Sequence, residues 1–118
     1  MRQQGAVVRS RLSIHKFKIM NESSKAAAGS KFDLGQVYMT PGASKALAES
    51  GEHPFSLLRR HQSGDWGDLC QEDKDANDEA VTKGGRILSA YHTKARVKIW
   101  AITEWDRSAT TLLLPDEY

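Results

Sequence analysis

The last third of the chain constrains the fold most strongly. Three segments rich in β-branched and aromatic residues follow one another there: RILSAYHT (86–93), ARVKIWAITEW (95–105) and ATTLLLP (109–115). Short polar breaks separate them. Residues of these kinds favour strands, and short polar breaks favour hairpin turns. The pattern therefore predicts a three-stranded antiparallel β-meander.

Both faces of this meander carry apolar side chains. In the middle segment Val97, Ile99, Ala101 and Thr103 lie on one side of the strand, and Trp100 and Ile102 lie on the other. A sheet that is apolar on both faces must be covered on both. We expect helices on one face and another surface on the second.

One strand and one helix are predicted at the start of the folded region. The segment LGQVYM (34–39) alternates between polar and apolar residues, as a strand does. Leu34, Val37 and Met39 would be its core contacts. The next segment suits a helix with Thr40 as N-cap, Pro41 in the first turn and Gly51 at its end.

Two more helices are predicted before the meander. One begins at Pro54, and its Phe55, Leu58 and His61 fall on one face. The other would be capped by Asp68 with Gln71 as its reciprocal partner, and would end at Gly84 and Gly85. Its thin apolar stripe would comprise Leu69, Asp73, Ala76, Ala80 and Val81.

The predicted fold class is therefore α+β, with an early strand, two to three short helices and then the three-stranded antiparallel meander. Residues 32–118 are expected to form a single α+β domain. Residues 1–31 are expected to be a disordered or loosely ordered basic tail and linker. The first 20 residues hold five basic residues and no acid, whereas residues 21–118 have a net charge of −3.

Several classes of function are disfavoured by what the sequence lacks. It has no phosphate-binding loop, dinucleotide-binding glycine motif, nucleophile elbow or H-E-x-x-H motif, which argues against an enzyme and against a cofactor. The single cysteine, Cys70, excludes an internal disulfide. Without a secretory apolar stretch or an apolar run of membrane length, we expect a cytoplasmic protein with no membrane partner.

The segment HQSGDWGDLCQED (61–73) concentrates the candidate site residues. His61, Asp65 and Trp66 could line a pocket or binding surface. Alternatively Trp66 fills the core between the helices and the sheet, and Asp65 and Asp68 accept bonds from local backbone N–H groups. The acids are not spaced as in a calcium loop, and the histidines form no zinc-type pair, so no metal site is predicted.

Two further surfaces could bind a partner. The helix after this segment is acidic, and Asp75, Asp78 and Glu79 could occupy a basic groove. Arg107, in the turn Asp106–Ser108, is a candidate for contacting an anion, although turns of this type also form for structural reasons.

The chain also resembles a known group of proteins. The segments that carry the resemblance are LGQVYMTPGA, RRHQSGDWGDL, DANDEA, GGRILSAY and IWAITEWDRSATTLLLPDEY. They resemble small proteins encoded on bacterial plasmids and other mobile elements, often named plasmid-related protein or type I restriction endonuclease subunit M. The methylase label does not fit, because the chain lacks the Asn-Pro-Pro-aromatic motif that holds a flipped base.

Three hypotheses of function follow. The first is a non-enzymatic protein-binding accessory factor of mobile elements, such as a defence inhibitor or a regulator. The second is a small hydrolase or nuclease-like enzyme with a cleft formed by His61, Asp65 and Arg107. The third is a DNA-binding accessory protein that uses the basic N-terminal arm. A homodimer is possible for a protein with an exposed meander edge.

Overall fold

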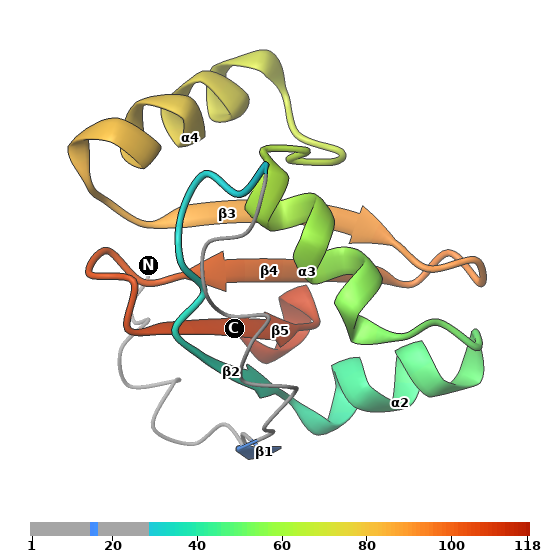
Figure 1. Cartoon of the computed structure of the whole chain (residues 1–118). Helices are drawn as coiled ribbons and strands as arrows, with labels where there is room; N and C mark the ends of the chain where they lie inside the picture. The colour runs from blue at the N-terminus through green and yellow to red at the C-terminus, as the bar shows by residue number, and fades with distance from the viewer. Residues whose placement is uncertain (1–14, 17–28) are drawn as a thin grey trace.

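The computed structural model describes residues 15–16 and 29–118 of the chain. One sheet with the strand order β1-β2-β5-β4-β3 is flanked by helices, so the predicted α+β class is confirmed (Figure 1). The strands are β1 His15–Lys16, β2 Gln36–Met39, β3 Ile87–His92, β4 Lys98–Thr103 and β5 Ala109–Leu113. The helices are α2 Pro41–Glu49, α3 Pro54–Ser63, α4 Gln71–Lys83 and the short 3₁₀ helix η2 Pro115–Glu117.

The predicted meander is confirmed. β3 pairs antiparallel with β4 from Ile87 opposite Thr103 to His92 opposite Lys98. β4 pairs antiparallel with β5, with Trp100 opposite Leu113. These three strands form one side of the sheet, from its middle to the β3 edge.

The early strand joins the same sheet in a way that the sequence did not predict. β2 runs parallel to β5, from Gln36 opposite Ala109 to Met39 opposite Leu112. Neighbouring parallel strands need a long crossover connection. Here the whole stretch from α2 to β4 provides it, so the first and last parts of the domain lie side by side.

The predicted N-terminal tail lies mostly outside the described residues. Within it, His15–Lys16 form β1, which pairs antiparallel with β2 through His15 opposite Met39 and Lys16 opposite Tyr38. The structure therefore describes a short β-contact between the tail and the edge of the domain.

Local caps explain where α2 and α3 begin and end. The hydroxyl of Thr40 accepts the Ala43 N–H at 3.2 Å, as expected for an N-cap, and Gly51 follows the last turn of α2 with φ +71°. α3 begins at Pro54 as predicted. Its buried face comprises Leu57, Leu58, His61 and Gln62, whereas Phe55 is only half-buried.

The prediction for α4 was wrong at its start and in part of its buried face. Cys70 is the N-cap, and the helix begins at Gln71, because Asp68 is held by the sheet. Asp73 and Ala76 are exposed, and the buried residues of α4 are Asn77 and Ala80. The amide of Asn77 explains its burial, since it bonds both Leu88 O (2.7 Å) and Leu88 N (3.2 Å) on β3.

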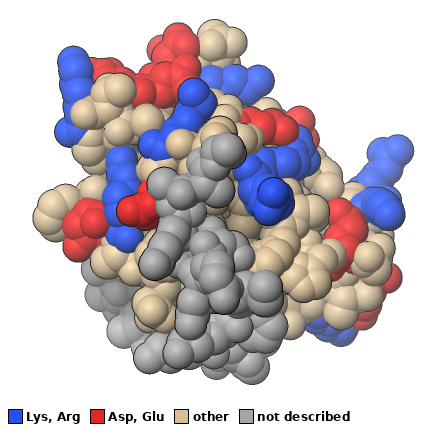
Figure 2. Space-filling model, in the orientation of Figure 1, with Lys and Arg blue, Asp and Glu red and all other residues tan. Residues whose placement is uncertain are grey.

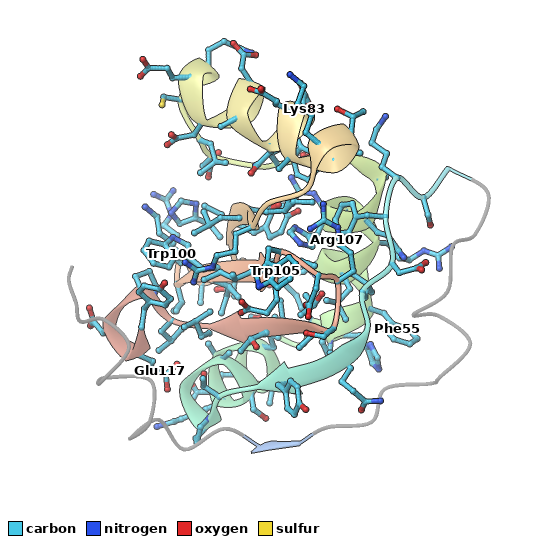
Figure 3. All side chains as sticks on the ribbon, turned by 90° about the vertical axis from the view of Figure 1, so that its left-hand side faces the viewer. Phe55, Lys83, Trp100, Trp105, Arg107 and Glu117 are labelled. Atoms are coloured by element: carbon cyan, nitrogen blue, oxygen red, sulfur yellow. The ribbon has the colours of Figure 1, made fainter. Side chains whose placement is uncertain are left out.

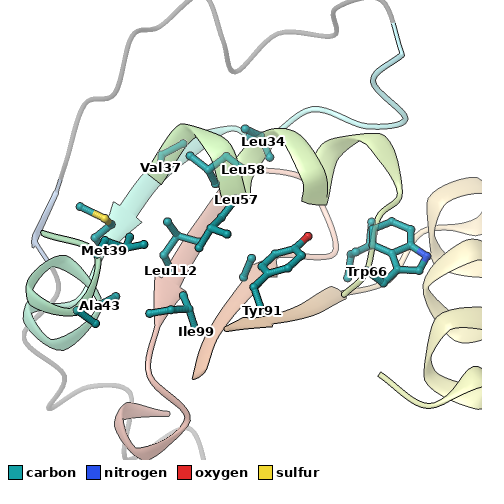
Figure 4. Packing of buried hydrophobic residues seen from close by; sticks show 14 of the residues in the cluster. Leu34, Val37, Met39, Ala43, Leu57, Leu58, Trp66, Tyr91, Ile99 and Leu112 are labelled. Atoms are coloured by element: carbon teal, nitrogen blue, oxygen red, sulfur yellow. The ribbon is translucent and has the colours of Figure 1, made fainter. Parts of the chain in front are cut away.

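The hydrophobic core lies between the sheet and α3, with α2 and α4 at its two sides (Figure 4). Leu34, Val37 and Met39 are buried in it, as predicted. They meet Leu57 and Leu58 of α3 and the sheet residues Ile87, Tyr91, Ile99, Ala101 and Leu112. On the opposite face Ala90, Ile102 and Leu113 are also buried.

Within residues 15–16 and 29–118, no helix combines the length and the apolar character needed to cross a membrane.

Candidate functional site

The segment 61–73 is organised around the buried indole of Trp66. Trp66 is 4% exposed and stacks on Phe32 at 6.2 Å between ring centroids. Its Nε1 donates to Asp78 of α4 at 3.0 Å. The structural interpretation is confirmed: Trp66 fills the core between α3, α4 and the sheet, and it tethers α4.

The backbone after Trp66 extends the sheet beyond β3. Ala90 N donates to Trp66 O at 3.1 Å, and Asp68 N donates to Ala90 O at 2.7 Å. Gly67 lies between them, in a parallel bridge with Ala90. Asp68 is therefore fixed before α4 starts, which explains why it does not cap that helix.

The two aspartates of this segment have different partners. Asp65 accepts Arg60 Nε at 2.7 Å and the Gly67 N–H at 3.2 Å, as expected for a local turn. The hydrogen bond from Arg60 holds the pKa of Asp65 below its usual value. Asp68 instead pairs with His92 of β3 at 2.5 Å, so the prediction of a local backbone partner for Asp68 was wrong.

His61 lies at one end of a buried chain of hydrogen bonds. Thr110 donates its hydroxyl proton to Leu34 O at 2.8 Å, so it can only accept from Thr103, at 2.7 Å. Thr103 must then accept from His61 Nε2 at 2.8 Å. His61 Nδ1 is left as the acceptor for the Ser89 hydroxyl at 2.6 Å. This order of donors places a proton on Nε2, and in a neutral imidazole Nδ1 is then the acceptor.

The neutral state agrees with the environment of the ring. His61 is 0% exposed, and burial, followed by the positive charge of Arg107, lowers its pKa to about 3. A charged imidazole would lose its hydration without gaining a carboxylate partner. His61 therefore connects α3 to β3 and β4, and it has no contact with solvent that a general base needs.

Arg107 is a structural anchor. Its Nη1 donates to Gly85 O at 2.7 Å and to Glu104 O and Trp105 O at 3.1 Å each, while Nη2 donates to Ala80 O at 2.7 Å. Ala80 O belongs to the last turn of α4, where a cation is favoured. The guanidinium is thus bound to carbonyl groups and joins α4 to the β4–β5 hairpin.

Replacing Arg107 with Met should lower the free energy of unfolding by about 2 kcal/mol, because Gly85 O and Ala80 O lose the half-buried hydrogen bonds of the guanidinium that links them. Urea denaturation would measure this change in the free energy of unfolding. Arg59→Met, at an exposed position of α3, is the control and should change stability by less than about 0.5 kcal/mol. Equal effects of the two substitutions would show that Arg107 does not anchor α4.

The acidic residues of α4 differ in their availability. Asp78 is committed to Trp66. Asp75 accepts from Gln71 at 2.9 Å and Glu79 from Lys83 at 3.2 Å, both on the exposed side of the helix. Figure 2 shows acidic side chains at the top of the molecule, where α4 lies, with basic side chains among them.

Trp105 was not among the candidate residues predicted from the sequence. Its side chain is 67% exposed, the largest exposed hydrophobic residue in the described part of the chain. It stands at the tip of the β4–β5 hairpin beside Arg107 (Figure 3). Its position in the sequence could have indicated this exposure. An aromatic residue directly before the Asp-Arg-Ser turn lies beyond the paired part of the strand.

The structure does not bring His61, Asp65 and Arg107 to one accessible point. His61 is in the core, Asp65 is on the surface with Arg60, and the Arg107 guanidinium is bound to carbonyl groups. This geometry gives no support to the cleft of the enzyme hypothesis. Cys70 is exposed, and in the described ranges no group of three or more histidine, cysteine or acidic residues could hold a metal ion.

The residues that do come together are linked through α4. Trp66 holds the helix through Asp78, and Arg107 holds it through Ala80 O. No family model, curated protein or solved structure matches the chain.

Proposed function

We propose that this chain is a non-enzymatic protein-binding accessory factor of mobile elements, an inhibitor or regulator of another protein. The observation that carries the proposal is the exposed indole of Trp105 on a hairpin that Arg107 fixes. Tryptophan residues often dominate the energy of protein interfaces when a partner buries them. A fixed hairpin also lowers the entropy lost on binding.

The outer side of α4 would form the rim of the same surface. Arg107 ties Ala80 of the helix to Trp105 of the hairpin, so the two elements keep a constant relative position. Asp75 and Glu79 are exposed on α4. Rim charges of this kind accelerate association with an oppositely charged surface and add specificity. The partner surface would therefore be basic around an apolar pocket.

Trp105→Ala should weaken binding of the protein partner at least about tenfold while leaving the fold intact, because an exposed side chain contributes little to stability. The measurement is capture from a bacterial lysate followed by titration of the purified partner. Lys45→Ala, on the exposed side of α2, serves as the control.

A second variant tests the rim. Reversing Asp75 and Glu79 to Lys should slow association and reduce its salt dependence, whereas Asp78 must be kept because it holds Trp66. If the partner binds the Trp105→Ala protein and the charge-reversed protein as tightly as the original chain, this surface is not the binding site and the proposal is wrong.

A further inference from the structure

The β3–β4 hairpin contains an arginine in an unexpected conformation. Arg96 and Arg107 are the only non-glycine residues in the described ranges with positive φ, at 70° and 62°. L-residues rarely adopt this conformation because it costs free energy. For Arg107 the four hydrogen bonds of its guanidinium explain why arginine is present. Arg96 has no such explanation, because its side chain is exposed and forms no ion pair with any residue that the structure describes.

The backbone of this hairpin is tightly fixed. Thr93 N donates to Val97 O at 2.9 Å, and Arg96 N donates to Thr93 O at 2.8 Å. Lys94 N donates to the Glu52 carboxylate at 2.7 Å. This turn requires a left-handed residue at position 96, for which glycine would be the least strained choice. With arginine at this position, the fixed turn presents an exposed guanidinium.

The cations around Arg96 are also unpaired. Lys94 and Lys98 are exposed, and none of the ion pairs in the described part of the chain includes them or Arg96. His92, directly opposite Lys98, is paired with Asp68. The hairpin therefore presents three positive charges within five residues that form no ion pair with a described residue, while the Glu52 carboxylate is bound to the backbone of Lys94.

Aromatic rings continue this basic surface along the sheet. Trp100 lies two residues after Lys98 on β4 and so points to the same face. It packs edge-on against Tyr118 at 5.9 Å, and the Arg86 guanidinium lies 5.3 Å from the centre of the Tyr118 ring. Trp100 and Tyr118 are half-buried, and the Tyr118 hydroxyl accepts a hydrogen bond from Arg86. Figure 3 shows Trp100 on the side of the sheet away from α3.

We propose that this face, formed by Arg96, Lys98, Trp100, Tyr118 and Arg86, binds single-stranded nucleic acid. Cations at both ends of the face would contact phosphates, and the aromatic rings between them would stack on unpaired bases. An acidic protein partner would contact the positive charges but not the aromatic rings. The bases of a duplex already stack on one another, so they would not stack on these rings. The site shares no residue with the surface of Trp105, Asp75 and Glu79, so the proposal does not rest on the proposed function.

The test is fluorescence anisotropy of a labelled oligothymidylate titrated with the full chain. We expect binding that weakens steeply with salt. Arg96→Gly should reduce the affinity at least fivefold while the melting temperature stays the same or rises, because glycine relieves the backbone at this position. A purely structural role of Arg96 would change stability and leave the affinity unaltered.

The matched control is Lys45→Ala, which removes one exposed positive charge from α2. The basic first 20 residues are identical in all variants, so differences among the variants report on the folded surface. Trp100→Leu should weaken binding even at high salt, where the charge contribution is screened.

Three results would overturn the proposal. The first is equal loss of affinity with Lys45→Ala and Arg96→Gly. The second is equal affinity of the full chain for single strands and for duplex of the same length. The third is binding to vesicles rich in phosphatidylserine without binding to the oligonucleotide.

Discussion

Acidification should destabilise this domain through His61 alone by about 1.4 kcal/mol for each pH unit below about 6.5. The folded protein holds the imidazole neutral, with a pKa lowered to about 3, whereas the unfolded chain has the usual value of 6.5. Between these values the unfolded state binds one more proton, so stability rises with pH. The stabilisation that comes from keeping His61 neutral is fully present above about pH 6.5. About 4 to 5 kcal/mol of this stabilisation is lost by pH 3.

Urea denaturation at a series of pH values between 7 and 4 measures this effect. His61→Gln is the matched variant, because its amide offers a donor and an acceptor but does not titrate in this range. The variant should show a much flatter dependence of its unfolding free energy on pH. Asp65 also loses its ion pair at low pH, but it does so equally in both proteins. Parallel curves would mean that His61 is accessible or already charged in the folded state.

Gly67→Ala should lower the free energy of unfolding by at least about 3 kcal/mol. A Cβ at this position would lie 2.0 Å from Ala90 O and 2.8 Å from a ring carbon of Tyr91. The backbone, at φ +77°, is also strained for any L-residue. Relief would require breaking the bridge to β3, which would move Trp66 out of the core.

The control for this substitution is Gly51→Ala. Gly51 has a similar φ of +71°, but no atom lies within 4 Å of a Cβ built there. The Gly51→Ala substitution should therefore lower the free energy of unfolding by only about 1 kcal/mol, the cost of an L-residue at positive φ. Thermal unfolding together with tryptophan fluorescence measures both effects. A Gly67→Ala protein as stable as the Gly51→Ala protein would contradict the close packing of the Trp66 segment against β3.

Much of the local structure could be predicted from the sequence. The strand segments 87–92, 98–103 and 109–113 and the caps at Thr40, Pro41 and Pro54 are local signals, and they appear where expected. The parallel pairing of β2 with β5 could not be predicted in the same way. It depends on contacts between residues more than 70 positions apart, for which a single sequence carries no periodic signal.

The candidate site shows the same division between local and distant effects. The core position of Trp66 was predictable from the turn around it. The roles of His61 and Arg107 were not, because their partners Ser89, Thr103 and Ala80 come from other elements. The start of α4 was predicted wrongly for a related reason, since His92 and Ala90 compete for Asp68. Trp105 and Arg96 became candidates only when their exposure and backbone angles were known.

The side chain of Glu117 contacts the start of α2. The Glu117 carboxylate accepts the Thr40 hydroxyl and, at 3.0 Å, the Gly42 N–H at the start of α2. Together with the β2–β5 pairing, it makes early residues depend on late ones. During synthesis on the ribosome, α2 therefore lacks its carboxylate partner and β2 its central neighbour until the last strand has emerged. Folding should therefore be slow, because these contacts join residues more than 70 positions apart.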